Sequence, residues 1–253
     1  MSLILFRSLL FFLYGIVIGS FLNVVIYRVP LNLPIAHGAR SMCPKCGHML
    51  HAPDLIPVFS FLFLKGKCRY CHAPISKRYP LVELLTGVLF MCSAVVYDIS
   101  FYAVLLCIYF SVLIIAWFID LDHTFIPDRV HVIILVLAVW SYFCGPFVSL
   151  KDRLIGGAAL GIFMFLISYF TGGGIGLGDV KLLASSGLLL GWKLAVPAFF
   201  LAYVIAVICL LPSIISGKAK AGFQVPMAPY FAVSLSFMAL FGNYVIRWYL
   251  GLF

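Results

Sequence analysis

Charge is scarce in this sequence, and negative charge is the scarcest. Only 10% of the 253 residues are charged, and only 8 residues are Asp or Glu. Soluble globular domains carry about 25% charged residues, so this composition excludes an ordinary soluble domain. Hydrophobic residues make up 64% of the chain, and the mean hydropathy is +1.16. The composition therefore predicts a polytopic membrane protein.

Two common hydrolase signatures are also missing. No serine lies in a GxSxG turn, and no HExxH helix is present to bind a catalytic zinc ion. The net charge of +9 could suggest nucleic-acid binding, but the sequence has no basic helix and no row of aromatic residues for stacking. The basic residues instead flank apolar runs. We expect them to set the topology and to contact anionic headgroups of the lipid bilayer, and we expect no nucleic-acid partner.

Eight apolar runs approach the length of a membrane span. We therefore expect an all-α protein with about eight transmembrane helices. The first run ends without a small-residue cleavage site, which argues against a removable signal peptide. Pro197 and Pro212 are expected to kink the seventh run or to mark its ends. The runs cover residues 8–27, 81–97, 101–119, 130–148, 154–171, 180–192, 194–214 and 227–249, and the sixth is the shortest.

The loops between these runs differ in positive charge. Alternate loops carry 12 of the 17 basic residues, and the side richer in Lys and Arg faces the cytoplasm. This predicts that both termini lie outside. It also predicts that the loops at 120–129 and 172–181 face the cytoplasm.

Residues 28–80 form a polar, proline-rich segment between the first two runs. The segment contains two CxxC pairs, Cys43 with Cys46 and Cys68 with Cys71, separated by 21 residues. Each pair offers two thiolates from a tight turn, and two such turns complete a tetrahedral zinc site. A loop of about 50 residues buries little core. A structural zinc ion would supply the stability that such a loop lacks.

Other interpretations of the cysteines stay open. The four could form two disulfides, act as redox thiols or bind no metal, although a cytoplasmic loop is in a reducing environment. Gly47 and Gly66 suit the turns of a metal site. A nearby histidine could replace one cysteine as a ligand: His48, His51 or His72. The other cysteines lie in apolar runs and are expected to be small buried hydrophobic residues: Cys92, Cys107, Cys144 and Cys209.

Two aspartates adjoin apolar runs. Asp120 directly continues one run, and Asp179 follows a glycine-rich break that begins at Thr171. A carboxylate is costly to bury at a membrane, so each is a candidate functional residue that needs a partner. We predict that the two meet and hydrolyse an amide, the ionised one activating water and the protonated one polarising the carbonyl. Gly176 and Gly178 are predicted to clear room for an extended substrate backbone.

Plainer interpretations of the acidic residues also exist. Asp128 could cap a helix or pair with the arginine that follows it, and Asp122 and His123 could be solvated loop residues. Asp179 could cap the short sixth helix, with Lys181 neutralising its charge.

Five motifs occur in order along nearly the whole chain. They are GSFLNVVIYRVP at 19–30, the two CxxC pairs, RYPLVE at 78–83, IDLDHTFIPD at 119–128 and GLGDVKL at 176–182. Together they resemble the prepilin peptidases, which are aspartyl proteases of the GxGD type in the bacterial inner membrane. The resemblance implies cleavage of a short basic leader from type IV prepilins or pseudopilins, just after a glycine, at the cytoplasmic face.

The resemblance also implies roles for individual residues. Asp120 and Asp179 correspond to the catalytic pair, with Asp122 and Asp128 as alternatives for the first acid and as support for the catalytic loop, together with Lys181. Many members also methylate the new amino terminus with S-adenosylmethionine, and the four-cysteine loop marks that longer class. Zinc and S-adenosylmethionine are therefore the expected cofactors, although the sequence shows no recognisable methyl-donor site.

Three further polar residues remain ambiguous. Asn23 and Arg28 could bind substrate or cofactor, but an asparagine in a span often only bonds a neighbouring helix. Glu83 could cap the second transmembrane helix or meet the basic leader of the substrate.

The motifs also suggest how the chain is divided. We expect a first transmembrane helix at 1–27, a zinc-binding loop at 28–80 and a seven-helix peptidase core at 81–253. One alternative is a broader intramembrane aspartyl protease resembling the presenilins. Another is a non-enzymatic zinc-binding scaffold, or a transporter of a secretion or pilus system, whose acids couple ions.

Overall fold

The computed structural model of the chain describes residues 2–35, 41–144, 148–216 and 225–251. Arg40, Lys218 and Lys220, which contributed to the predicted orientation, lie outside these residues. The elements of regular secondary structure in the described part are all helices, which confirms the all-α fold class. The chain divides into two compact units, Met1–Ala103 and Val104–Phe253.

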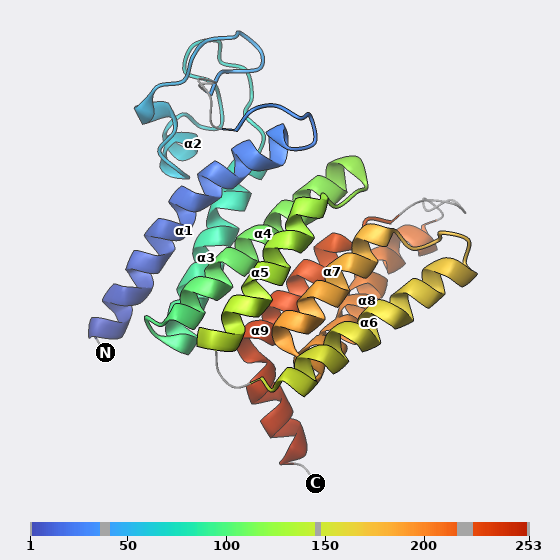
Figure 1. Cartoon of the computed structure of the whole chain (residues 1–253). Coiled ribbons are helices and arrows are strands. Elements are labelled where there is room, and N and C mark those ends of the chain that lie inside the picture. Colours follow the sequence, from blue (N-terminus) through green and yellow to red (C-terminus); the bar gives the residue numbers. More distant parts are fainter. Residues whose placement is uncertain (1, 36–40, 145–147, 217–224, 252–253) are drawn as a thin grey trace. The chain divides into compact units, whose positions relative to one another are not determined.

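Eight long helices in the described part match the eight apolar runs (Figure 1). Six are long and apolar enough to cross a membrane, so the chain is a multi-pass membrane protein. Helices α5 and α7 are shorter, with 17 and 14 residues. The helices are α1 (Ser2–Arg28), α2 (Phe59–Phe63), α3 (Arg78–Tyr97), α4 (Phe101–His123), α5 (Asp128–Cys144), α6 (Leu150–Phe170), α7 (Leu177–Leu190), α8 (Trp192–Ile215) and α9 (Ala228–Leu250), with a short 3₁₀ turn, η1 (Ala52–Asp54), in the first loop.

In the first unit, α1 and α3 pack side by side (Figure 1). Two glycines of α1 allow a close approach, because a Cβ at Gly15 or Gly19 would lie 2.7 Å from the Cα of Gly87 or Glu83. Small residues spaced four apart commonly form such helix contacts in membranes. Gly19, which opens the first motif, is therefore a packing residue.

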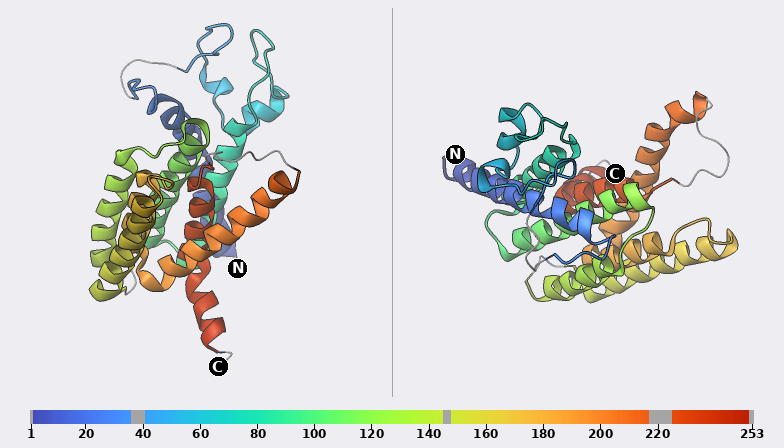
Figure 2. Two further views of the ribbon diagram at one scale, coloured as in Figure 1. Left: turned by 90° about the vertical axis from the view of Figure 1, so that its right-hand side faces the viewer. Right: turned by 90° about the horizontal axis from the view of Figure 1, so that it is seen from above.

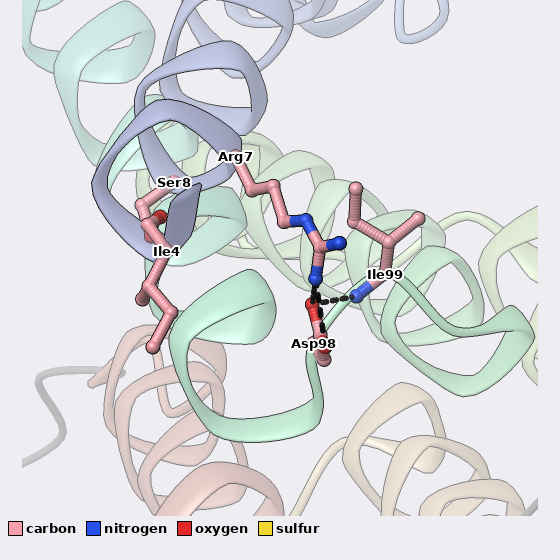
Figure 3. A network of polar contacts seen from close by, with 5 residues as sticks. All are labelled: Ile4, Arg7, Ser8, Asp98 and Ile99. Carbon is pink, nitrogen blue, oxygen red and sulfur yellow. Dashed lines mark hydrogen bonds and ion pairs between the residues drawn. The ribbon is translucent and has the colours of Figure 1, made fainter. Parts of the chain in front are cut away.

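An ion pair joins the amino-terminal end of α1 to the end of α3 (Figure 3). Arg7 donates to both carboxylate oxygens of Asp98, at 2.7 and 2.9 Å. The backbone N–H of Ile99, and then the Arg7 guanidinium, lower the pKa of Asp98. Arg7 lies within α1, ahead of the run that the sequence analysis placed in the membrane. The pair gives this arginine a counter-ion at the end of a spanning helix, where an unpaired charge would be costly.

In the second unit, α7 packs against α5, α6 and α8. The closest contact is between two glycines of α6 and α7. A Cβ at Gly156 would lie 2.6 Å from the carbonyl oxygen of Gly187, and a Cβ at Gly187 would lie 2.5 Å from that of Gly156. Both glycines are therefore needed for α7 to lie this close to α6.

Arg153 fixes the end of α7 that lies away from the glycine-rich loop. Its side chain is only 5% exposed. Its guanidinium donates to the carbonyl oxygen of Leu189 at 3.1 Å and to the hydroxyl of Ser141 in α5. The carboxyl ends of helices leave backbone carbonyls without helical partners, and a buried arginine satisfies them here. Arg153, one of the 17 basic residues used to predict the topology, therefore lies inside α6 and not in a loop.

The last two helices also differ in detail from expectation. Pro197 and Pro212 both lie inside α8, so neither marks an end of that helix. Figure 2 shows α9 extending past the other helices of its unit. Exposed Trp248 and Tyr249 lie near that end of α9, and these residue types are enriched where membrane meets water.

The cysteines of the long helices are not equally buried. Cys107 is buried and Cys92 is partly buried, but Cys209 is exposed on α8. The expectation of a buried side chain is therefore wrong for Cys209, which faces outward from its helix. The side chain of Cys144 lies outside the described residues.

Candidate functional site

Asp120 lies in the last full turn of α4 and is held by the start of α9. Its side chain is buried, with 6% of the residue exposed. The backbone N–H of Ala228, the first residue of α9, donates to Oδ2 of Asp120 at 3.0 Å. The amino-terminal N–H groups of a helix lack helical acceptors and carry partial positive charge. The Ala228 N–H therefore stabilises the Asp120 carboxylate, while burial of the carboxyl group opposes its ionisation.

Asp179 is in the first turn of α7, just after the glycine-rich loop. Gly172 and Gly173 adopt left-handed conformations with φ of 63° and 88°, which end α6. Ser168 of α6 then donates to the carbonyl of Ile175 at 2.7 Å, which fixes the loop before α7 begins. The result is a short, defined path from α6 to Asp179.

The two oxygens of Asp179 have different surroundings. Oδ1 is buried and has no hydrogen-bond partner among the described residues. If Gly176 carried a Cβ, that atom would lie 3.6 Å from Oδ2 of Asp179. The Cβ would have no other neighbouring atom within 4 Å. One oxygen therefore faces inward, and the other lies beside the open space that the missing side chain of Gly176 leaves.

The lack of a side chain at Gly178 lets the segment after Asp120 pack against the start of α7. A Cβ at Gly178 would lie 3.2 Å from the Cβ of Ile126, a buried residue between α4 and α5. The Asp120 and Asp179 carboxyl groups interact electrostatically. The space at Gly178 is thus filled by the protein's own Ile126, so the expectation that it clears room for a substrate is wrong for this glycine.

The four cysteines of the first loop form a second candidate site, in the first unit. The sulfur atoms of Cys43, Cys46, Cys68 and Cys71 all lie within 4.8 Å of one another, so they could hold a metal ion. The Sγ atoms of Cys43 and Cys71 are 3.8 Å apart. This is the edge expected for a tetrahedron with Zn–S bonds of about 2.3 Å, and it is far longer than the S–S bond of a disulfide, about 2.05 Å.

The two cysteine turns have the same construction. In the first, Cys43 N–H donates to His48 O at 2.9 Å, and in the second, Cys68 N–H donates to Ala73 O at 2.8 Å. Gly47, with φ of 69°, and His72, with φ of 56°, take equivalent left-handed positions after the second cysteine of each turn. The N–H groups of Cys46 and then Lys45 lower the pKa of Cys43 to about 6. A thiolate suited to a metal is therefore available at neutral pH.

Asp54 holds the second cysteine turn in place. Its carboxylate accepts from Arg69 Nε at 2.6 Å, Tyr70 O–H at 3.0 Å and His51 N–H at 3.1 Å. Both Arg69 and Tyr70 lie between Cys68 and Cys71. The ring of Tyr70 also lies 3.5 Å from that of His48, so the histidine beside the first turn packs on the second turn.

Known proteins resemble the chain over almost its full length. Residues 13–97 match the bacterial peptidase A24 N-terminal domain, and residues 107–211 match the type IV leader peptidase family. A prepilin leader peptidase/N-methyltransferase of Bacillus subtilis (strain 168) is 34% identical over 239 residues, covering 94% of this chain and 96% of the relative. The chain belongs to the type IV leader peptidase family.

Two further relatives agree with this membership. Prepilin leader peptidase/N-methyltransferases from Aeromonas hydrophila and Stutzerimonas stutzeri are 35% and 34% identical, covering 95% and 93% of this chain and 93% and 91% of the relatives. No solved structure matches the chain. A member of a peptidase family needs groups that activate a nucleophile and polarise the peptide carbonyl, and Asp120 and Asp179 are the candidates that the described residues bring together.

The other acids near this aspartate pair are more exposed. Asp122 lies in the last turn of α4, so the prediction of a loop residue is wrong. Asp128 begins α5 and pairs with Lys181 Nζ at 2.6 Å, and both side chains are largely exposed. Lys181 thus bonds Asp128 and not Asp179, and Gly176, not Asp179, occupies the cap position of α7. The pair ties the start of α5 to α7.

The three ambiguous polar residues lie in the first unit of this peptidase. Asn23 is buried and donates to the carbonyl of Tyr79 in α3 at 3.2 Å, as expected for a contact between helices. Arg28 donates to the carbonyl of Pro34 at 3.1 Å. Roles for these two in binding substrate or cofactor stay predictions.

Glu83 anchors the first loop of the peptidase to α3. Its Oε2 accepts the N–H of Val58 at 2.7 Å, and Ser20 of α1 also bonds its carboxylate. Val58 has φ of 63°, a conformation unusual for a branched residue. Glu83 lies beyond the first turn of α3, so it does not cap that helix. Contact between Glu83 and a basic leader stays a prediction.

Proposed function

We propose that the chain is a membrane aspartyl endopeptidase that removes the short basic leader from type IV prepilins or pseudopilins. The observation that carries the proposal is the pairing of buried Asp120 with Asp179, whose carboxyl groups interact electrostatically. Family membership supports it, because the matched relatives are named as prepilin leader peptidases.

The surroundings of the two acids suggest their separate roles. Asp120 accepts a backbone N–H, which favours its ionised form. Asp179 has a buried oxygen without a donor and a like charge nearby, which both favour its protonated form. The start of α7 favours charge on Asp179 by about 0.3–1 kcal/mol, which is less than the penalty for an unpaired buried carboxylate, about 1–3 kcal/mol or more.

The proposed reaction follows from these protonation states. Asp120 takes a proton from a water molecule, whose oxygen forms a bond to the scissile carbonyl carbon. Asp179 gives its proton from Oδ2 to the carbonyl oxygen, which yields a neutral gem-diol. Asp120 then protonates the leaving nitrogen as the C–N bond breaks, and Asp179 recovers a proton from the diol. Each acid ends in its starting state.

The location of the reaction is also part of the proposal. We place the aspartate pair at the cytoplasmic face of the bacterial inner membrane, because positive charge is concentrated in the loops on that side. The first transmembrane helix at 1–27, the loop at 28–80 and the peptidase core at 81–253 are the proposed functional divisions. The bilayer and the precursor protein are the proposed partners.

Zinc and S-adenosylmethionine are the proposed cofactors. The four cysteines fit zinc in number, chemistry and spacing, and the ion would stabilise the loop without entering the cleavage reaction. Methylation of the new amino terminus is proposed because the relatives are named N-methyltransferases. No residue is assigned to the methyl donor.

The decisive experiment uses the detergent-solubilised full chain and two synthetic precursors. Both carry an apolar helix after a glycine, and one has a basic leader while the other has a neutral leader. We expect mass spectrometry to show cleavage after the glycine and much faster cleavage of the basic precursor. Added S-adenosylmethionine should methylate the new amino terminus. Equal cleavage of both precursors would favour the broader protease, and no cleavage by folded protein would favour the scaffold or transporter.

The two glycines before Asp179 should respond differently to substitution. Gly178→Val is expected to push Ile126 away and to lower the melting temperature, because adding carbons to a packed site costs about 1–3 kcal/mol. Gly176→Ala should leave stability unchanged, since its Cβ meets only Asp179 Oδ2, at 3.6 Å. If a substrate uses the space at Gly176, the alanine will slow cleavage. Thermal unfolding and cleavage rates test this, and equal stability losses in both variants would contradict it.

A further inference from the structure

The hydroxyl of Tyr203 in α8 has only a weak hydrogen-bond partner among the described residues. Its oxygen lies 4.0 Å from the sulfur of Met164 in α6. A thioether sulfur is a poor acceptor. Tyr203 is partly buried, and a buried tyrosine hydroxyl usually has a hydrogen-bond partner. The proton of this hydroxyl is therefore available to a better acceptor nearby.

The ring of Tyr203 packs between two other aromatic rings. It lies 4.9 Å from the ring of Phe199 and 6.0 Å from that of Phe231. Phe231 is fully buried, one turn after Ala228, whose N–H bonds Asp120. Helix α9, which positions the first acid through Ala228, therefore also contacts the ring of this phenol through Phe231.

Asp179 is the acid that lacks a donor. Its Oδ1 is buried without a partner in the described part of the chain, and Tyr203 and Asp179 interact electrostatically. Helix α8, which carries Tyr203, packs against α7, which carries Asp179. An available donor and an unsatisfied acceptor thus lie close together on adjacent helices.

We propose that Tyr203 is a positioning residue of the peptidase site, whose hydroxyl turns from Met164 and donates a hydrogen bond to the inward-facing Oδ1 of Asp179 when that carboxyl group loses its proton. The proposal rests on the proposed function. The bond holds the carboxylate with Oδ2 facing the space beside Gly176, where the diol would return its proton. It also stabilises the Asp179 carboxylate that remains after its proton has moved to the carbonyl oxygen.

The other charged groups on the surrounding helices have different electrostatic neighbours. On α5, Asp128 pairs with Lys181. Buried His131 interacts electrostatically with these two residues, although neither of its ring nitrogens has a hydrogen-bond partner among the described residues. On α6, Arg153 bonds the carbonyls at the far end of α7. Asp120 on α4 is the like-charged neighbour of Asp179, and α9 contributes the Ala228 N–H to Asp120. Tyr203 on α8 is therefore the residue that we propose as the donor to Asp179.

The test is Tyr203→Phe, which keeps the ring and its packing. We expect kcat to fall about 10- to 100-fold, the loss of a hydrogen bond to a charged group, with KM nearly unchanged. A donor favours the ionised form of an acid, so its removal lets Asp179 keep its proton to higher pH. The alkaline limb of the kcat profile should therefore move up by about one pH unit. Tyr230→Phe, a matched change on α9, should alter neither quantity.

Two outcomes would overturn this inference. One is a wild-type kcat and pH profile for Tyr203→Phe. The other is a loss of kcat without a shift of the alkaline limb, which would show a packing role alone. Asp179→Asn, measured in parallel, separates the two proposals. If Asp179→Asn still cleaves the precursor, the proposed function fails; if Asp179→Asn is inactive and Tyr203→Phe behaves as wild type, only the role of Tyr203 fails.

Discussion

Asp179→Asn is expected to slow precursor cleavage by about 10³-fold or more. Asparagine has nearly the same shape, so α7 and its contacts with α6 should be retained. The amide cannot give a proton to the scissile carbonyl and take it back, so the gem-diol would form without an acid. Cleavage of the basic-leader precursor by the purified variant measures the effect, and a melting temperature near that of wild type shows that the fold is intact.

Variants of the other acids identify the partner of Asp179. Asp120→Asn should be as inactive as Asp179→Asn, and the double variant should be no worse, because the pair acts as a unit. Asp122 and Asp128 are exposed, so their asparagine variants should retain most of the activity. Asp152→Asn, on α6, is the control for activity that is lost while the protein is prepared. An inactive Asp122→Asn or Asp128→Asn beside an active Asp120→Asn would move the first acid to that position.

Replacing Cys43 and Cys68 with serine is the second change with a large expected effect. Each turn then loses one thiolate, and the loop can no longer complete a four-sulfur site. Structural zinc contributes an apparent binding energy of about 10–16 kcal/mol in small domains. We expect bound zinc to fall from about one per chain to none, and residues 41–77 to become sensitive to added protease.

The matched control for the double cysteine variant is Cys92→Ser with Cys107→Ser. These thiols lie on α3 and α4, apart from the four-cysteine group, so the control should keep its zinc. A wild-type zinc content in the Cys43 and Cys68 variant would refute the metal site. A protected loop without zinc would instead show that the Asp54 network holds the loop by itself.

Helix positions were predictable because the membrane imposes a simple rule on sequence. All eight apolar runs became helices, since a backbone in lipid must satisfy its own hydrogen bonds. The four-cysteine group was predictable for a similar reason, because CxxC spacing reports local turn geometry. Both patterns depend on residues close together in the sequence.

Contacts between distant segments were not predictable in this way. Nothing in the sequence indicates that Ala228 holds Asp120, that Ile126 fills the space at Gly178, or that Arg153 is buried. Tyr203 also carries no motif and lies in an apolar run. Such roles depend on which faces of the helices meet, and hydrophobicity alone is nearly uniform around these helices, so it does not specify the faces.

The hydrogen bond between Ala228 and Asp120 has a consequence for biogenesis. The two residues are 108 positions apart, so a growing chain makes the acid long before the amide that holds it. Until α9 docks, Asp120 has no such donor, and a buried carboxylate without one takes up a proton. Under the proposed mechanism, a partly inserted chain would lack its base, so proteolysis would begin only after the membrane domain is assembled.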